Sequence, residues 1–292
     1  MESSMAPSRV LQVLPLLILT VAIASDATTI TVVNKCSYTV WPGALPGGGV
    51  RLDPGRSWTL NMPAGTAAAR VWPRTGCSFD GSGRGRCITG DCAGALACRV
   101  SGEQPATLAE YTLGQGGGRD FFDLSVVDGF NVPMNFQPVG GASCRGASCA
   151  ADITRQCPPE LQVAGGCASA CGKFGGDTYC CRGQFTDHCP ATNYSRFFKG
   201  KCPDAYSYAK DDQTSTFTCP AGTNYQILFF SAALISQPPS PPLPDAIPRF
   251  KSPAAAARRP RHLQRRPTLL RRPSSGALLS SAVPTSSAEP TN

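Results

Sequence analysis

GRGRCITGDCAGALAC, residues 83–98, is the stretch of this 292-residue chain that says most about its fold. It contains three cysteines, Cys87, Cys92 and Cys98, separated by glycine and other small residues. Such residues let the backbone close tight turns, and closely spaced cysteines in a turn-rich segment are typical of disulfide-linked loops. The stretch therefore predicts tight turns between cysteines that form disulfides.

The remaining cysteines support this interpretation. All fifteen lie between Cys36 and Cys219. Metal binding is the rival interpretation, but the chain has only two histidines, His188 and His262, and lacks both CxxC pairs and the ligand spacing of a zinc site. We therefore expect disulfides made in an oxidising compartment, with no metal site and no cofactor.

The N-terminus predicts export. Arg9 precedes a largely apolar run over residues 10–23, and Ala-Ile-Ala at residues 22–24 fits the A-x-A pattern of a cleavable signal peptide. The run is too short to span a membrane, and no later segment approaches the roughly 18 apolar residues that a transmembrane helix needs. We expect residues 1–26 to be a signal peptide and the mature protein to be secreted and extracellular.

The positive charge of the chain lies mainly in its C-terminal segment. The formal net charge is +8, but residues 1–230 carry 18 basic and 17 acidic side chains, whereas residues 231–292 carry 9 and 2. A basic domain would suggest nucleic acid as a partner. Because the folded part is nearly neutral, we expect no nucleic-acid partner.

Residues 28–230 consist largely of short β-type runs bounded by Gly, Pro, Asn and Asp. This texture predicts one mainly β domain over residues 27–230, built as a sandwich or a barrel. The expected strands are TITVVN (29–34), SYTVWP (37–42), SWTLNM (57–62), ARVWP (69–73), GFNVPMNF (129–136), STFTC (215–219) and YQILFF (225–230).

The texture changes in two places. Over residues 144–202, nine cysteines crowd among glycine and polar residues, and only YSRFFKGKC (194–202) resembles a short helix. We expect a lobe there that disulfides hold together.

Residues 231–292 are rich in Pro, Ala, Ser and Arg and should form a disordered Pro/Arg/Ser-rich tail. The tail is either a basic adhesive or sorting extension or an unselected appendage from an altered 3′ coding end.

Four further segments match, in order, the motifs of one family: TLAEY (107–111), FFDLSVVDGFNVPM (121–134), CPDAYSYAKDD (202–212) and STFTCPAGTNYQILF (215–229). Together with residues 83–98 they resemble the thaumatin family, the osmotin/thaumatin type of pathogenesis-related group five. The resemblance implies a β-sandwich core, a disulfide-rich lobe of loops and short helices, and a plant defence function.

Spacing alone cannot give the disulfide connectivity, because the possible pairings are too numerous. The resemblance implies seven bridges: Cys77–Cys87, Cys92–Cys98, Cys144–Cys219, Cys149–Cys202, Cys157–Cys167, Cys171–Cys180 and Cys181–Cys189. Cys36 is left free, since the family places its partner in a stretch like YQILFC, where this chain has Phe230. That bridge would close a loop of about 190 residues, worth on the order of 5 kcal/mol. The free thiol is either buried and inert or available for intermolecular pairing.

Carboxylates are the candidates for chemistry, because no His lies near a nucleophile in a known motif and no Gly-rich phosphate loop occurs. The resemblance implies an acidic cleft lined by Arg70, Glu110, Asp123, Asp128 and Asp212, with Asp211 as the alternative to Asp212. Crowding should raise the pKa of at least one carboxyl. For hydrolysis of a glycoside, Glu110 is the expected proton donor and Asp128 the base or nucleophile, while Arg70 keeps a neighbouring carboxylate ionised. The alternative for Asp128 is a turn role, since a glycine follows it.

Other candidate site residues also have two interpretations. Four aromatic residues could stack on sugar rings or belong to the core: Phe121, Phe122, Phe130 and Tyr208. Asn193 begins a glycosylation sequon, Asn-Tyr-Ser, in the lobe. Alternatively, Asn193 caps a helix that begins at Tyr194.

The leading interpretation is a secreted, monomeric antifungal protein that binds β-1,3-glucan of fungal walls through the acidic cleft. A weak endo-β-1,3-glucanase that uses paired carboxylates is the enzymatic alternative. Two more alternatives need no chemistry in the cleft: an inhibitor that binds another protein, and a protein that permeabilises the fungal surface or membrane. A sweet-tasting role belongs to a few basic members of the family, and a nearly neutral domain gives it little support.

Overall fold

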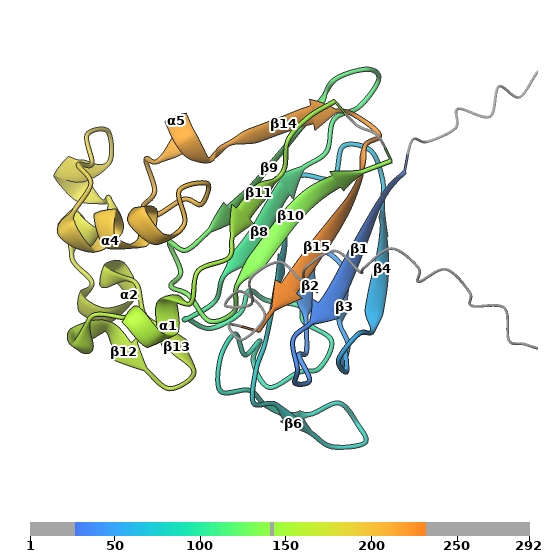
Figure 1. Cartoon of the computed structure of the whole chain (residues 1–292), viewed down its shortest axis with the longest axis horizontal. Coiled ribbons are helices and arrows are strands. Elements are labelled where there is room, and N and C mark those ends of the chain that lie inside the picture. Colours follow the sequence, from blue (N-terminus) through green and yellow to red (C-terminus); the bar gives the residue numbers. More distant parts are fainter. Residues whose placement is uncertain (1–26, 141–142, 232–292) are drawn as a thin grey trace, which may run out of the picture. The chain divides into compact units, whose positions relative to one another are not determined.

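The computed structural model describes residues 27–140 and 143–231 (Figure 1). The predicted signal peptide and all but the first residue of the predicted tail lie outside the described residues. The described part is mainly β, with two large sheets and a lobe of short helices beside them, which confirms the predicted fold class. Within the two described ranges, no helix is long and apolar enough to cross a membrane.

One sheet has five strands in the order β11-β10-β15-β1-β4. β1 runs parallel to β15 and antiparallel to β4, whereas β10 is antiparallel to both β15 and β11. The first and last strands of the domain are therefore neighbours, and each supports the other. The bounds are β1 Thr28–Lys35, β4 Ser57–Met62, β10 Met134–Val139, β11 Ala147–Cys149 and β15 Asn224–Phe230.

The other large sheet has six strands in the order β14-β9-β8-β5-β2-β3, and all of its neighbours are antiparallel. The bounds are β2 Gly43–Leu45, β3 Gly48–Gly49, β5 Ala69–Trp72, β8 Leu108–Thr112, β9 Arg119–Ser125 and β14 Phe217–Pro220.

The two sheets pack on one shared hydrophobic core. Alternate residues of each strand point inward. The ring centroid of Phe122, on β9, lies 4.9 Å from that of Phe136, on β10, and 5.1 Å from that of Tyr225, on β15. The Tyr225 hydroxyl also donates a 2.8 Å hydrogen bond to Oδ2 of buried Asp120, on β9. Apolar burial, at about 1.5–3 kcal/mol per large side chain, and this polar contact together fix one sheet against the other.

The lobe occupies the left of Figure 1 and consists of short elements. Three disulfides lie within it, and Cys149–Cys202 ties the end of its longest helix to β11. Two 2.8 Å backbone hydrogen bonds between Phe130 and Cys167 fasten it to the loop after β9. The elements are α1 Ile153–Gln156, η1 Pro159–Leu161, β12 Gln162–Val163, β13 Gly166–Cys167, α2 Ala170–Phe174, α3 Asp177–Cys180, η2 Gly183–Phe185 and α4 Asn193–Lys201; α5 Asp212–Ser215 follows the lobe.

A capping box starts helix α4. The Thr192 hydroxyl accepts a 3.2 Å hydrogen bond from the backbone N–H of Ser195, and the Ser195 hydroxyl accepts a 2.7 Å bond from the backbone N–H of Thr192. The cap is therefore Thr192, and Asn193 is the first helical residue. The alternative in which Asn193 caps a helix starting at Tyr194 is wrong by one residue.

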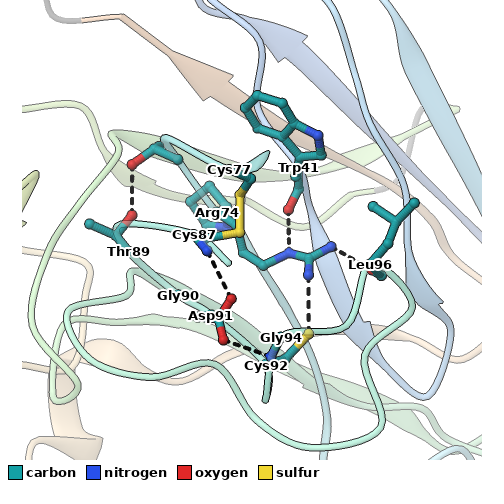
Figure 2. Close-up of a disulfide and its surroundings, with 12 residues drawn as sticks. Trp41, Arg74, Cys77, Cys87, Thr89, Gly90, Asp91, Cys92, Gly94 and Leu96 are labelled. Atoms are coloured by element: carbon teal, nitrogen blue, oxygen red, sulfur yellow. Dashed lines mark hydrogen bonds between the residues drawn. A yellow bond between two sulfur atoms is a disulfide. The ribbon is translucent and has the colours of Figure 1, made fainter. Parts of the chain in front are cut away.

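Residues 83–98 close around the buried guanidinium of Arg74 (Figure 2). Its nitrogens donate to the backbone carbonyls of Trp41 at 2.6 Å, Ala95 at 2.7 Å and Leu96 at 2.6 Å. Burial lowers its pKa to about 10, so the group stays charged at neutral pH. Buried Asp91 braces the same turns by accepting backbone N–H bonds from Cys87 and Gly94 at 2.9 and 2.8 Å.

The same segment carries a small hairpin, β6 Ser78–Phe79 and β7 Gly85–Arg86. The disulfides Cys77–Cys87 and Cys92–Cys98 hold it. The carbonyls around Arg74 belong to irregular backbone and have no N–H donors from a neighbouring strand. The guanidinium supplies the hydrogen-bond donors in their place.

Three expected strands are wrong in extent. At residues 215–219 the strand begins only at Phe217, since Ser215 belongs to α5. At residues 37–42 the structure has only a single bridge, between Val40 and Leu52. The side-chain amide of Asn34 donates to the carbonyls of Tyr38 and Leu52 and so holds the chain in a turn. At residues 129–136 the strand begins only at Met134, after a proline that has no N–H for a ladder. Conversely, β8 and β9 are absent from the expected strands.

The seven disulfides join the same cysteine pairs that the resemblance implies. In the described part of the chain Cys36 alone has no partner; it is 2% exposed, and burial raises the pKa of its thiol to about 11. The structure thus agrees with the buried, inert alternative. Lys35, which precedes it, lies opposite Phe230 in the β1/β15 ladder.

Replacing Arg74 by lysine should lower the free energy of unfolding by about 2–4 kcal/mol. An ammonium group cannot match the three carbonyls arranged around a planar guanidinium, so buried carbonyls lose their partners. Denaturant unfolding with the disulfides intact measures the change. Arg86→Lys, at an exposed position of the same segment, is the control and should change stability by less than about 0.5 kcal/mol. A similar loss in both variants, or no loss in Arg74→Lys, would contradict this role.

Replacing Phe230 by cysteine should produce an eighth disulfide, with Cys36. The new bridge would close the domain's longest loop, and chain-entropy estimates put its stabilisation at up to about 5 kcal/mol. A thiol assay on the denatured chain should find one free thiol in the wild type and none in the variant, and the melting temperature should rise. In a Cys36→Ala background Phe230→Cys should give no rise. Two free thiols in the single variant would sink the prediction.

Candidate functional site

Three of the candidate side chains lie in one row across the six-stranded sheet. Arg70 on β5 is paired in register with Glu110 on β8, and Glu110 is paired with Asp123 on β9. Directly opposed residues have Cβ atoms about 4.5–5.5 Å apart and share one face. The neighbours of each along its strand, such as Ala109 and Tyr111 around Glu110, are buried in the core. The row therefore lies on the outer face of the sheet.

Arg70 and Glu110 form a partly buried ion pair. Nη2 of Arg70 lies 3.4 Å from Oε1 of Glu110, and both side chains are 29% exposed. Nη1 of Arg70 donates a 3.3 Å hydrogen bond to the Ser101 hydroxyl. Arg70 is thus held over the sheet, where its charge acts on both carboxyl groups of the row.

A pocket of about 260 Å³ opens at this row, and we call it the carboxylate pocket. Asp128, in the loop after β9, supplies a third carboxylate. Its Oδ1 accepts a 2.7 Å hydrogen bond from Nε2 of Gln104, and its backbone carbonyl accepts a 3.0 Å bond from the N–H of Ala106. The pocket is lined by Arg70, Leu108, Glu110, Asp123, Ser125, Val127, Asp128, Tyr206 and Ala209.

Asp128 lies in a turn and also lines the pocket. The N–H of Gly129 bonds to the carbonyl of Val126 at 3.0 Å, which closes a turn, and Gly129 has a φ of +86° that favours glycine. The turn therefore presents the Asp128 carboxylate to the pocket.

Asp212 is not among the residues that line the pocket, although its charge acts on Asp123. It accepts a 2.9 Å hydrogen bond from the hydroxyl of Tyr206, a residue that does line the pocket. Asp211 is not an alternative to it: its Oδ2 accepts bonds from the backbone N–H and hydroxyl of Ser207 at 3.0 and 2.8 Å and lies 3.1 Å from Nζ of Lys199. Through these buried contacts Asp211 links helix α4 of the lobe to the segment that follows it.

Two carboxyls of the pocket have raised pKa values. Burial raises the pKa of Asp123 to about 8; the carboxylates of Glu110 and Asp212 add to this increase, and Arg70 opposes it. Burial also raises the pKa of Glu110; the carboxylate of Asp128 adds to the increase, and Arg70 opposes it. Oδ1 of Asp123 is buried and has no hydrogen-bond partner among the described residues. Asp123 is therefore the carboxyl that most readily keeps a proton near neutral pH, whereas the sequence had pointed to Glu110 as the proton donor.

The aromatic candidates lie in different places. Phe122 and Phe130 are each 1% exposed and belong to the core, so stacking on sugars is the wrong interpretation for both. Phe121 is 49% exposed and lines an adjoining pocket of about 210 Å³ that shares Glu110 and Asp123 with the first.

Tyr208 lines a different, small cavity inside the lobe, together with Tyr179 and Ser169. Tyr206 takes the place beside the carboxylates that the sequence suggested for Tyr208. A backbone bridge to Ser125 on β9, with the N–H of Tyr206 donating to the carbonyl of Leu124 at 2.8 Å, puts it there.

Among the described residues, no group of three His, Cys, Asp or Glu side chains is arranged so that it could hold a metal ion. The mutual repulsion of the carboxylates is relieved instead by the Arg70 charge and by the proton on Asp123.

The model of the thaumatin family matches residues 34–231. The chain belongs to the thaumatin family. It is 59% identical, over 69% of its length and 88% of the relative's, to a thaumatin-like protein from Actinidia deliciosa. It is 57% identical to pathogenesis-related thaumatin-like protein 3.2 from Cryptomeria japonica, over 70% of this chain and 88% of that one. It is 58% identical to an alpha-amylase/trypsin inhibitor from Zea mays, over 68% and 98%.

These relatives place the chain among the pathogenesis-related, thaumatin-like defence proteins of plants. The match ends at Ser231, where the composition changes to the Pro/Arg/Ser-rich segment. The family's features are therefore carried by the two sheets, the segment around Arg74 and the lobe.

Replacing Asp123 by asparagine should make the protein more stable at pH 8 and remove a pH dependence. The folded-state pKa of Asp123 lies above its ordinary value, so between about pH 4 and pH 8 the folded state binds the extra proton and wild-type stability falls as pH rises. Asparagine cannot ionise, and the variant should gain on the order of 2 kcal/mol at pH 8, after allowance for solvent screening.

Thermal unfolding of both proteins between pH 4 and pH 9 checks this. The difference in melting temperature between Asp123→Asn and the wild type should grow up to about pH 8 and then level off. Asp53→Asn, on an exposed loop, should differ from the wild type by a constant amount over the same range. A constant difference for Asp123→Asn as well would mean that Asp123 is ionised at pH 7.

Proposed function

We propose that this thaumatin-like protein is secreted and acts against fungi by binding wall β-1,3-glucan in the carboxylate pocket. The observation that carries the proposal is the mixture of neutral donor, cationic donor and anionic acceptors around one opening. Asp123 holds a proton, Arg70 donates from its guanidinium, and Glu110 and Asp128 present acceptor oxygens. A neutral polysaccharide offers hydroxyl groups that need both kinds of partner.

The adjoining pocket extends this binding surface. It shares Glu110 and Asp123 with the carboxylate pocket and adds the exposed ring of Phe121. One face of a pyranose ring carries only C–H groups and packs well on an aromatic ring. Two neighbouring sugar units of one chain could therefore bind side by side, one through its hydroxyls and one against Phe121.

Secretion is part of the proposal. The seven disulfides belong to an oxidising compartment, and residues 1–26 carry the pattern of a signal peptide. The extracellular space fits both, and the vacuole is the alternative destination.

A weak endo-β-1,3-glucanase is the second candidate function, because Glu110 and Asp123 both have raised pKa values beside the third carboxylate, Asp128. Glu110→Gln removes the proton that a general acid must deliver. Release of reducing ends from laminarin by wild type, Glu110→Gln and Asp123→Asn decides the question, and equal rates in all three would exclude hydrolysis through either carboxyl.

A third candidate is inhibition of another enzyme, favoured by the relative from Zea mays that is named an alpha-amylase/trypsin inhibitor. Inhibition of that kind would involve surface loops. It should survive substitutions in the carboxylate pocket, which separates it from glucan binding.

Binding to insoluble β-1,3-glucan should depend on the pocket and on the proton of Asp123. We expect Asp128→Asn and Arg70→Gln each to weaken binding about 10-fold, the equivalent of one charged hydrogen bond. Asp123→Asn should bind at pH 6 and retain binding at pH 9, where the wild type ionises Asp123 and loses affinity.

A pull-down with curdlan at both pH values measures this, with cellulose as the control polysaccharide and Asp53→Asn as the control variant. Binding that is unchanged in Asp128→Asn and Arg70→Gln would overturn the assignment of the pocket.

A further inference from the structure

Three aromatic rings lie together on the surface of the lobe, away from the carboxylate pocket. They belong to Phe174 at the end of α2, Tyr179 on α3 and Tyr194 on α4. Their ring centroids are 5.6 Å apart for Phe174 and Tyr179, 5.4 Å for Phe174 and Tyr194, and 6.0 Å for the two tyrosines. The side chain of Phe174 is 45% exposed. The rings of Tyr179 and Tyr194 are half-buried, so part of this aromatic cluster is accessible from solvent.

The surroundings hold the rings in place. The disulfide Cys171–Cys180 joins α2 to α3, and so ties the segment of Phe174 to that of Tyr179. The Tyr194 hydroxyl donates a 2.9 Å hydrogen bond to Oε1 of Glu160. The rings therefore form a fixed surface and need little ordering when something packs on them.

A pocket of about 570 Å³ opens beside these rings, and Asn193 stands in its wall. Asn193 is exposed and begins the Asn-Tyr-Ser sequon. Its side-chain oxygen accepts a 3.2 Å hydrogen bond from Nη1 of Arg196. That contact uses the oxygen and not the nitrogen, which is the atom that carries an N-linked sugar. The wall is formed by Glu160, Thr178, Tyr179, Thr192, Asn193, Tyr194 and Arg196.

We propose that Asn193 carries an N-linked glycan whose first sugars fold back into this pocket and pack on Tyr179 and Tyr194. In the modifying step, the side-chain nitrogen of Asn193 bonds to the anomeric carbon of a lipid-pyrophosphate oligosaccharide. The bond from that carbon to the pyrophosphate oxygen breaks, and lipid pyrophosphate and a proton leave. The proposal rests on secretion, one part of the proposed function, and is independent of glucan binding.

The chemistry of the pocket suits an N-acetylglucosamine. The C–H face of the sugar can lie on an aromatic ring, while its hydroxyl and acetamido groups meet the hydroxyls of Thr178 and Thr192 and the guanidinium of Arg196. The covalent link to Asn193 holds the sugar at high effective concentration, so even a weak stacking contact suffices to keep it docked.

The test uses the full chain, secreted by a yeast host, and begins with peptide mass mapping. The peptide that contains Asn193 should carry the glycan. An endoglycosidase that leaves a single N-acetylglucosamine should keep the melting temperature of the wild type unchanged. An amidase that removes the whole glycan should lower it by about 2–4 °C, the size expected for one lost contact in a domain of this length.

Two variants separate docking from the mere presence of a glycan. In Tyr179→Ser, and independently in Tyr194→Ser, which keeps the sequon, removal of the glycan should change the melting temperature by less than half of the wild-type shift. The amidase converts Asn193 to aspartate in every case, so this change cancels in the comparison, and an unglycosylated Asn193→Asp chain is the matched control.

Either of two results would overturn the proposal: an unmodified Asn193 in the secreted chain, or an equal fall of the melting temperature in the wild type and in both aromatic variants. A curdlan pull-down on the same glycosylated and deglycosylated samples keeps this outcome distinct from the fate of the glucan proposal.

Discussion

The antiparallel register of β5, β8 and β9 is the constraint on which the site depends. It sets Arg70, Glu110 and Asp123 opposite one another on the outer face of the sheet, while the residues beside them point into the core. Because strand side chains alternate with a period of two, a slip of one residue in β8 would bury Glu110 and expose Tyr111. The same burial that stabilises the sandwich therefore keeps the charged row in place.

Two segments cover the outer face of this sheet on either side of the row, and they are the reason that the pKa of Asp123 is raised. Trp72, two residues after Arg70 on β5, is sealed under the segment with the Cys92–Cys98 disulfide, which the buried guanidinium of Arg74 organises. On the other side, the backbone bridge at Tyr206 closes the wall along β9. Partial exclusion of water between these covers raises the pKa of Asp123, at a cost in stability that the disulfide-linked scaffold offsets.

The fold class and the disulfide-rich lobe could be predicted from the sequence, because cysteine crowding and period-two patterns are local signals. The strand that carries Arg70, β5, was also predicted, but β8 and β9, which carry Glu110 and Asp123, were not. In β9 a polar residue, Asp120, points inward and an aromatic residue, Phe121, points outward, so the period-two pattern is lost. Motif matching gave the residues of the row but not their register. The sequence pointed to Tyr208 where the structure has Tyr206, and it left Asp211 open as an alternative to Asp212. The backbone bridge at Tyr206 and the contact of Asp211 with Lys199 exist only in the folded chain.

Burial and the neighbouring carboxylates favour a neutral Asp123 carboxyl within a row of charges. A carbon-13 NMR titration of the side-chain carboxyls measures this, with the Asp123 signal assigned by its loss in Asp123→Asn. The midpoint of Asp123 should lie near 8. A midpoint near 4, together with those of exposed aspartates, would contradict it.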